Sequence, residues 1–393
     1  MLYLDNAATT TVDSQVLYDI YKALNVYWAN PSSIYQSGKD MKNILNTARK
    51  QVADYINAEP EEIIFTSGGS ESNNLALKGV VDRYYCDTIL TTEIEHPSVY
   101  EAVNYLKDKK QISVGYIPVD DQGIVDLNCL EDMLEKHKNQ TWKRVLVSIM
   151  FANNEIGTIQ NVKAIGKLCD KYSNVIFHTD AVQAFGQVPI DVKKMKIGLM
   201  SVSGHKFHLP KGIGFLYKRK DIELEPLIHG GHQENNLRAG TENIPYIYAM
   251  GRQIERMSKI DLIAENCCDA DTWVYIAGLK LKKKYPKIKI NGSPTYRLKR
   301  NLSITIPGIP ADMLIAMLDD MGVCVSAGSA CSSGEAKPSR VLRAIGLSDK
   351  EASETIRVSW AHDTFTQDLE RFVDALIECI DSIQLLLGTE GEE

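Results

Sequence analysis

The sequence predicts an α/β fold in which a large, doubly wound, mainly parallel sheet of seven strands is joined to a smaller α+β unit. Over the first 250 residues, short apolar runs typical of buried strands alternate with amphipathic stretches typical of helices. The chain has 393 residues, which is long enough for one large core and a second, smaller one. Both observations favour two units of unequal size.

Seven apolar runs are the predicted strands of the large sheet, and the segments between most of them have helical spacing. The predicted strands are residues 62–67, 88–92, 113–118, 144–151, 175–179, 199–203 and 214–217. The predicted helices are residues 41–56, 72–83, 98–107, 127–137 and 162–172. In such sheets ligands bind in the crevice at the carboxyl ends of the strands.

The rest of the chain predicts the smaller unit. A helical, charged segment from about residue 246 to 285 connects to it. Strands are expected at 301–306, 323–326 and 355–359, and helices at 310–320, 338–344 and 367–387. The first dozen residues are too short to fold alone and are expected to join this unit. The predicted domains are therefore 14–250, and 1–13 together with 251–393.

Composition excludes several classes of function. Apolar residues make up 44% and charged residues 24%, which is ordinary for a soluble globular protein, and the net charge of −7 gives no support for binding nucleic acid or an anionic membrane. No apolar run approaches the roughly 18–20 residues that cross a bilayer, and the N-terminus lacks the basic start of a signal peptide. The eight cysteines form no C-x-x-C pair and no zinc spacing. We expect a cytoplasmic protein with free thiols and no metal site.

The most informative feature is a carboxylate and an amine that each follow a predicted strand. Asp180 ends the run 175–180, and Lys206 ends the run 199–206. Pyridoxal phosphate needs such a pair, because the amine forms the Schiff base and the carboxylate keeps the pyridine nitrogen protonated, so that the ring can accept electrons. Taken alone, each residue is better explained by an ordinary surface ion pair. The neighbouring residues decide in favour of the cofactor site.

A second set of residues suits the phosphate of such a cofactor. The predicted strand 62–67 runs into Gly68, Gly69 and Ser70, and a predicted helix follows. Glycines let the backbone approach an anion, and a helix N-terminus presents free N–H groups. This turn alone is a weak signal, since many strands and helices are joined by two glycines. Ser203 and His205, which flank the turn before Lys206, can donate to the same phosphate.

Further polar residues follow other strands. Gln183 and Asn154 could each bond the phenolic oxygen of the cofactor, although an asparagine after a strand is also a common turn residue. His96 could stack on the ring and shuttle protons, and its alternative is a structural histidine. Arg357, in the predicted strand 355–359, is either an exposed arginine or a bidentate clamp for a substrate carboxylate.

Cys331 differs from the other cysteines. It lies in residues 326–335, a stretch rich in glycine, serine and alanine with no large apolar anchor, which favours a mobile loop. Cys169 and Cys379 lie instead on helical patterns, where they are expected to be buried. An exposed thiol on a loop is a liability unless it is used, so we predict that Cys331 is functional.

At this point the sequence resembles the NifS/IscS-type cysteine desulfurases, which have the aminotransferase-like fold of pyridoxal-phosphate enzymes. The resemblance covers nearly the whole chain in an ordered series of motifs. They are residues 3–10 (YLDNAATT), 30–33 (NPSS), 65–73 (FTSGGSESN), 153–157 (NNEIG), 178–183 (HTDAVQ), 203–206 (SGHK), 210–214 (PKGIG), 238–243 (RAGTEN), 328–333 (GSACSS) and 338–346 (PSRVLRAIG). The chain departs from the usual pattern at Gly69, Leu209 and Tyr35.

The resemblance implies a role for each candidate residue. Lys206, Cys331 and His96 are the implied catalytic residues. The implied cofactor-binding residues are Gly69, Ser70, Asn154, Asp180, Gln183, Ser203, His205, Lys206 and Thr241. Thr241 would reach the phosphate in the partner subunit, so a homodimer is implied. Arg357 and Asn30 would bind the carboxylate of the substrate.

The implied activity is removal of sulfur from L-cysteine, leaving L-alanine and a persulfide on Cys331. The sulfur would pass to an iron–sulfur scaffold protein, or to tRNA or cofactor thiolation. One alternative on the same scaffold is a selenocysteine lyase or a cysteine sulfinate-cleaving enzyme, whose leaving groups need no enzyme thiol. Another is a catalytically silent scaffold protein, against which the presence of Lys206, Asp180 and Cys331 argues. A dinucleotide-binding dehydrogenase is disfavoured, because no G-x-G-x-x-G follows the first strand.

Overall fold

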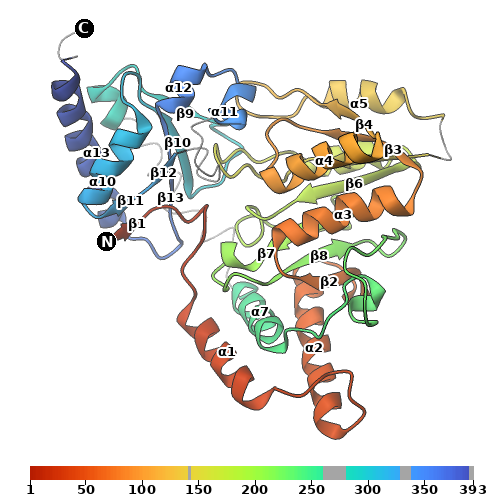
Figure 1. Ribbon diagram of the computed structural model, residues 1–393. Coiled ribbons are helices and arrows are strands. Elements are labelled where there is room, and N and C mark those ends of the chain that lie inside the picture. Colours follow the sequence, from red (N-terminus) through yellow and green to blue (C-terminus); the bar gives the residue numbers. More distant parts are fainter. Residues whose placement is uncertain (140–142, 260–279, 328–337, 389–393) are drawn as a thin grey trace.

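A computed structural model describes residues 1–139, 143–259, 280–327 and 338–388 of the chain (Figure 1). A large sheet with helices on both faces occupies most of the molecule, and a smaller sheet with its own helices lies beside it, together with the first residues of the chain and the helix that ends at residue 387. Within the described residues, no helix is both long and apolar enough to cross a membrane.

The large sheet has seven strands in the order β2-β8-β7-β6-β5-β3-β4. The strands are β2 (Ile63–Thr66), β3 (Cys86–Thr91), β4 (Ser113–Tyr116), β5 (Arg144–Ser148), β6 (Val175–Asp180), β7 (Leu199–Ser203) and β8 (Gly214–Lys218). β8 runs antiparallel to both of its neighbours, and the other pairs of this sheet are parallel. The predicted fold class, a mainly parallel seven-stranded sheet, is confirmed, and each predicted strand of this sheet is present.

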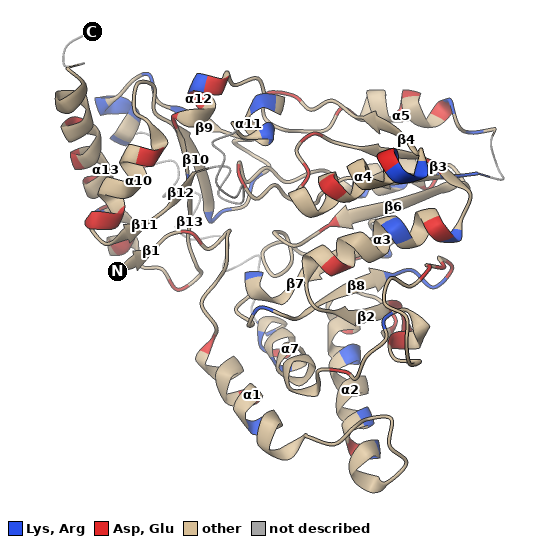
Figure 2. Ribbon diagram, in the orientation of Figure 1, with Lys and Arg blue, Asp and Glu red and all other residues tan. Residues whose placement is uncertain are grey.

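Helices cover the two faces of this sheet through separate apolar clusters. α3 (Gly69–Arg83) and α4 (Pro97–Lys110) pack on one face. The other face is covered by α2 (Gln36–Tyr55), α5 (Leu127–Glu135), α6 (Val162–Cys169) and α7 (Ile244–Met257). The strands are buried on both sides, which explains their nearly continuous apolar sequences. Figure 2 shows residues of both signs of charge interspersed along α3 and α4.

The smaller unit contains a four-stranded antiparallel sheet in the order β12-β13-β10-β9. Its strands are β9 (Lys289–Asn291), β10 (Asn301–Thr305), β12 (Ser326–Ala327) and β13 (Thr355–Ser359). The helices of this unit include α10 (Ala311–Asp320), α11 (Arg340–Ala344), α12 (Asp349–Ser353) and α13 (Thr366–Leu387), of which α10 and α13 pack against the sheet in a cluster of their own. β1 (Leu2–Tyr3) pairs in parallel with β11 (Val323–Cys324) in the same region. The exact division into domains at residues 14 and 251 stays a prediction.

The structure contains elements that the sequence did not predict. Helix α1 (Ser14–Val26) is one of them, and β9 and α12 are two short ones. The apolar pattern of α1 is misleading, because Leu17, Tyr18 and Leu24 are exposed whereas Asp19 is buried. Asp19 is tolerated there because its carboxylate accepts a hydrogen bond from Arg256 at 2.7 Å. Helices α2, α3 and α4 also begin earlier than predicted, since their first turns are polar or contain proline.

The outer edge of β2 is capped by a buried ion pair. Glu234 accepts the backbone N–H of Phe65 at 2.8 Å, and Arg49 donates to the carbonyl of Ile63 at 2.5 Å. The two side chains are joined by a pair of hydrogen bonds of 2.7 and 2.8 Å. Because β2 pairs only with β8, this ion pair satisfies backbone groups that a further strand would otherwise bind.

Replacing Glu234 with glutamine is expected to lower the free energy of unfolding by about 3 kcal/mol, because the Arg49 guanidinium would stay buried without its counter-charge. The change is measured as a shift of the urea unfolding midpoint. The matched control is Asp54→Asn, which breaks the exposed Lys50–Asp54 pair on the same helix as Arg49 and is expected to change stability by roughly 0–1 kcal/mol. Equal effects of the two variants would contradict this account of the edge.

Candidate active site

A cavity of about 210 Å³ lies at the carboxyl ends of the parallel strands, where their following turns converge. Turns after β2, β3, β5, β6 and β7 contribute to it, and β13 of the smaller unit closes one side. Among the residues that line it are the predicted site residues Gly69, Ser70, His96, Asn154, Asp180, Gln183, Ser203, His205, Lys206 and Arg357. The fold therefore brings most of the predicted site together.

Asp180 and Lys206 reach the cavity from neighbouring parallel strands. Asp180 is the last residue of β6 and stands opposite Ser201 of β7, while Lys206 ends the short helical turn Gly204–Lys206 that follows β7. Asp180 is only 4% exposed, so it is not part of a surface ion pair. Its carboxylate accepts hydrogen bonds from the Asn73 side chain at 2.7 Å and from the backbone N–H of Val182 at 2.9 Å.

The Lys206 amine is held by the N-terminal segment of the chain. Its Nζ donates to the carbonyl oxygens of Ala7 and Ala8, at 2.5 and 2.6 Å. The Gln183 amide also donates to Ala7, at 3.0 Å, and a hydrogen bond of 3.1 Å joins His205 to Thr9. The same short segment thus orders three predicted site residues.

The turn between β2 and α3 forms the predicted phosphate cradle. Helix α3 begins at Gly69, and the first N–H groups of a helix have no intrahelical acceptor. A Cβ atom on Gly69 would lie 2.7 Å from Cγ2 of Val182, so any larger residue here would require Val182 to move. Burial, with the charges of Lys206 and Lys211, lowers the pKa of His205 to about 4, so His205 is neutral at neutral pH.

His96 begins helix α4 as its N-cap. The backbone N–H of Ser98 donates to His96 Nδ1 at 3.1 Å, so this nitrogen must be an acceptor and the neutral ring carries its proton on Nε2. Burial is the main cause that lowers the pKa of His96, while Asp180 opposes the shift. The Ser98 hydroxyl bonds His96 and accepts from Asn73, which in turn donates to Asp180. A continuous hydrogen-bonded network therefore links His96 to Asp180.

Arg357 reaches the cavity from the smaller sheet, and it is only 3% exposed. One of its amino groups is 2.7 Å from the Asp5 carboxylate, and the other donates to the Asn154 carbonyl at 3.2 Å. Its buried Nε has no partner among the described residues. The alternative of an exposed arginine is wrong, because the guanidinium is buried at the junction of the two sheets.

Three predicted residues are not part of this cavity as described. The Asn30 side chain is exposed and accepts a hydrogen bond from the backbone N–H of Ser32 at 2.8 Å. Thr241 is exposed in the loop before α7. Cys331 lies outside the described residues. The roles assigned to these three residues stay predictions.

Other residues of the site were missed by the sequence reasoning. Asn73 and Ser98 form the network beneath Asp180, and Asp5 pairs with Arg357. Asn73 follows Gly69 by one helical turn, so the helical spacing places both on the same side of α3 and could have identified Asn73. No local pattern marks Asp5, because its partner lies at the other end of the chain.

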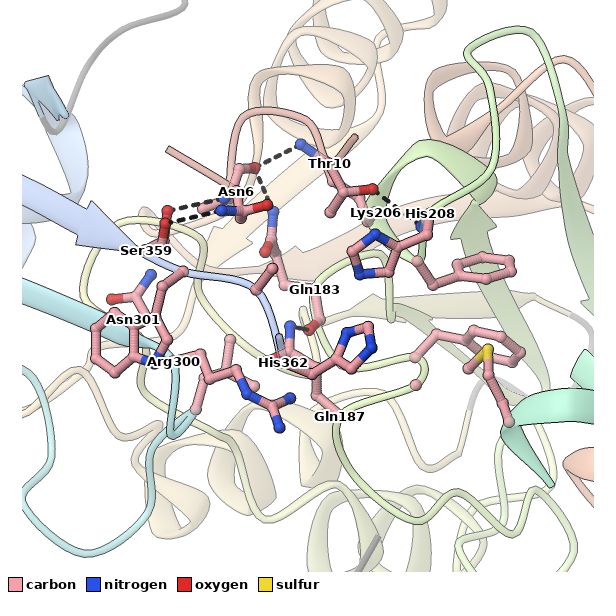
Figure 3. A pocket seen from close by; sticks show the side chains of 18 of the residues that line it. Asn6, Thr10, Gln183, Gln187, Lys206, His208, Arg300, Asn301, Ser359 and His362 are labelled. Atoms are coloured by element: carbon pink, nitrogen blue, oxygen red, sulfur yellow. Dashed lines mark hydrogen bonds between the residues drawn. The ribbon is translucent and has the colours of Figure 1, made fainter. Parts of the chain in front are cut away.

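A second cavity, of about 270 Å³, shares Ala7, Gln183 and Lys206 with the first. Its lining also includes Asn6 and Thr10 of the N-terminal segment (Figure 3). The rings of His208 and His362 lie at its wall with centroids 5.0 Å apart. Leu209, a departure from the related pattern, is fully buried in the main core and does not line either cavity.

Comparisons with known proteins agree with this geometry. The aminotransferase class-V family model matches residues 2–372. The chain is 40% identical to a cysteine desulfurase IscS from Methanosarcina thermophila, over 98% of this chain and 93% of that protein. It is similar to the solved structure of a NifS-like protein, with a TM-score of 0.86, 34% identity and coverage of 97% and 99%. A structure of SspA in complex with cysteine matches with a TM-score of 0.77, 34% identity and coverage of 91% and 98%.

The buried His178 beneath the site predicts a pH dependence of stability. It lies on β6, two residues before Asp180, with both ring nitrogens bonded to Ser148 and Ser201, and burial lowers its pKa to about 3. Because the unfolded chain binds a proton near pH 6.5 and the folded chain does not, stability is present above that pH and is lost as the pH falls towards 3.

We expect His178→Asn to reduce the slope of unfolding free energy against pH, measured by urea unfolding between pH 6.5 and 5, by up to about 1.4 kcal/mol per pH unit. The substitution also lowers stability at pH 8 by removing hydrogen bonds, so the slope and not the absolute value is the relevant quantity. An unchanged slope would show that His178 is not kept neutral by the fold.

Proposed function

The chain belongs to the aminotransferase class-V family, and we propose that it is a pyridoxal 5′-phosphate-dependent cysteine desulfurase. It takes sulfur from L-cysteine and leaves L-alanine. The observation that carries the proposal is the convergence of a buried carboxylate, a lysine amine, a phosphate cradle and a buried arginine on one cavity. The similarity to curated cysteine desulfurases over nearly the whole chain supports the choice of reaction.

The residues of the cavity fit the cofactor. Asp180 would pair with the ring nitrogen and Lys206 would bind the aldehyde, while His96 would stack on the ring. Asn154 and Gln183 would bond the phenolic oxygen. The α3 N-terminus with Ser70, Ser203 and His205 would hold the phosphate. One observation of the fit is that Asp180 accepts hydrogen bonds from Asn73 and Val182, which hold its carboxylate in place at the wall of the cavity.

When bound, the cofactor supplies an electron sink that allows a bond at the substrate Cα, and then the carbon–sulfur bond, to break. Arg357 would bind the substrate carboxylate with its planar fork, and Asp5 holds the guanidinium in its present orientation. The Lys206 amine would relay the proton that leaves Cα, since it lines the same cavity as Arg357.

We assign the sulfur-transfer step to Cys331. A free thiol has a pKa of about 8.5 and is mostly protonated at neutral pH, so a base must remove its proton. His96 is the candidate base, and the proton would go to Nδ1, the unprotonated nitrogen that bonds Ser98 in the present arrangement. The Cys331 thiolate then attacks the substrate sulfur, the carbon–sulfur bond breaks with its electron pair on the carbon fragment, and a persulfide remains on Cys331. The carbon fragment takes up a proton and leaves as alanine.

The cellular setting is part of the same proposal. We propose a cytoplasmic homodimer in which Thr241 reaches the phosphate bound by the partner subunit. The persulfide sulfur passes to an acceptor, such as an iron–sulfur scaffold protein or a tRNA or cofactor thiolation system. The second candidate function, with the same site residues, is a selenocysteine lyase or a sulfinate-cleaving enzyme. The activity of such an enzyme would not depend on Cys331, whereas that of a cysteine desulfurase would.

Replacing Cys331 with serine is expected to abolish persulfide formation while the protein keeps its bound, coloured cofactor, because the thiol is the sulfur carrier and does not hold the cofactor. The measurement is intact mass after incubation with L-cysteine, with and without a reductant. The wild-type protein should gain one reducible sulfur atom on the peptide that contains Cys331.

Two controls accompany this test. Cys324→Ser changes a partly buried cysteine on β11 and should leave the mass gain intact. Borohydride reduces a Schiff base to a stable bond, so it should attach the cofactor to the wild-type protein but not to Lys206→Ala. This variant should also show no gain of mass after incubation with L-cysteine. Release of sulfur from cysteine by Cys331→Ser at the wild-type rate would overturn the assignment and favour the lyase.

A further inference from the structure

Helix α11 begins with two residues, Ser339 and Arg340, that reach from the smaller unit to the turns carrying His96 and Asn154. Neither residue lines the cavity where the reaction is proposed. Their contacts nevertheless converge on the two turns that deliver site residues from β3 and β5.

Arg340 contacts the chain before and after His96. Its Nε donates to the carbonyl of Glu93 at 2.6 Å, and its Nη2 donates to the carbonyl of Glu95 at 2.5 Å. Its guanidinium carbon lies 3.4 Å from the ring centroid of Tyr100, which is on the first turns of α4. A planar fork that both bonds two carbonyls and stacks on a ring is specific to arginine, so lysine cannot reproduce the arrangement.

Ser339 makes the matching contact with the other turn. Its hydroxyl donates to the carboxylate of Glu155, the residue next to Asn154, at 2.5 Å and also caps α11 by accepting from Leu342. Behind both contacts lies a separate apolar cluster, in which Ile94, Met150 and Ile156 from the active-site side pack against α11. The residues of this cluster on α11 are Val341 and Leu342, and Ile345 joins them as the C-cap of the helix. The docking of α11 is therefore well defined by packing as well as by hydrogen bonds.

We propose that Arg340 is a positioning residue for the desulfurase reaction, which holds His96 in register with Asp180 and Lys206 by fixing the turn that precedes α4. The inference rests on the proposed function of the cavity. In this proposal, α11 of the smaller unit sets the position of His96, which follows β3 of the large sheet. The placement of His96 therefore depends on how the two units pack against each other.

The charge of Arg340 adds to the geometric effect. The charged groups that act on His96 are Asp180, which raises its pKa, and Lys206 and Arg340, which lower it together with burial. The nearby carboxyls on the facing turns are Glu93, whose carboxylate lies 3.8 Å from Arg340 Nε, and the buried Glu95 and Glu155. Burial raises the pKa of Glu95 to about 8 and that of Glu155 to about 7. Removing the positive charge of Arg340 should therefore raise the pKa of His96, whereas a lysine at this position should keep it low.

The test compares Arg340→Met, which loses the fork and the charge, with Arg340→Lys, which loses only the fork. The matched control is Arg343→Met on the same helix, where an exposed arginine pairs with Asp349 at 2.9 Å. The holoenzymes are assayed for alanine release from L-cysteine across pH. We expect kcat to fall about tenfold or more in both Arg340 variants, because small displacements of a catalytic group are costly, and to stay unchanged in the control.

Two further readouts separate positioning from a loss of stability. The ascending limb of kcat/KM against pH should move to higher pH in Arg340→Met but not in Arg340→Lys, a difference that a loss of stability would not produce. In a His96→Gln background, Arg340→Met should have little additional effect, because the two residues act through one group.

The inference is overturned if Arg340→Met matches Arg343→Met in kcat and in pH profile, or if its effect is undiminished in the His96→Gln background. A wild-type protein that releases no alanine would instead overturn the proposed function. The inference can still be tested in that case by following the titration of His96 by NMR with labelled histidine. Its midpoint should be higher in Arg340→Met than in the wild-type protein, and an equal midpoint would contradict the role of Arg340.

Discussion

The parallel pairing of β6 with β7 is the constraint on which the site depends. Parallel strands end at the same edge of a sheet, so the residues that follow them must lie close together. The register that sets Asp180 opposite Ser201 places the carboxylate and the turn of Lys206 side by side. Burying Asp180 is unfavourable by itself, and the hydrogen bonds from Asn73 and Val182 compensate the loss of water.

The N-terminal segment joins the two units at the site. Asp5 pairs with Arg357 of the smaller sheet, while Ala7, Ala8 and Thr9 bond Gln183, Lys206 and His205 of the larger one. β1 and the bridge between Asp5 and Ser359 hold this segment against the smaller unit. A segment without a core of its own is thereby ordered by long-range contacts, and it sets the orientation of groups that belong to distant parts of the chain.

His96 and Asp180 are also held by partners that do not themselves react. Ser98 fixes the tautomer of neutral His96, Asn73 fixes the Asp180 carboxylate, and Arg340 fixes the backbone before α4. Buried polar groups are costly unless they are bonded, so these partners satisfy the groups and also determine their positions. The smaller unit takes part through Arg357 and α11, and the geometry of the site therefore depends on how the two units meet.

The sequence by itself determined the fold class, the strands of the large sheet and most residues that line the cavity. Strand and helix patterns are local, and residues at the ends of parallel strands are brought together by topology alone, as for Asp180 and Lys206. The sequence failed at α1, because the exposure of Leu17 and the burial of Asp19 depend on what α1 packs against. Only the tertiary structure shows that Asp5 pairs with Arg357 and that Asn73 donates a hydrogen bond to Asp180. The same holds for the hydrogen bonds from Arg340 to the turn before His96. These contacts join segments far apart in the chain, and their geometry is set by the packing of whole elements, which no local pattern contains.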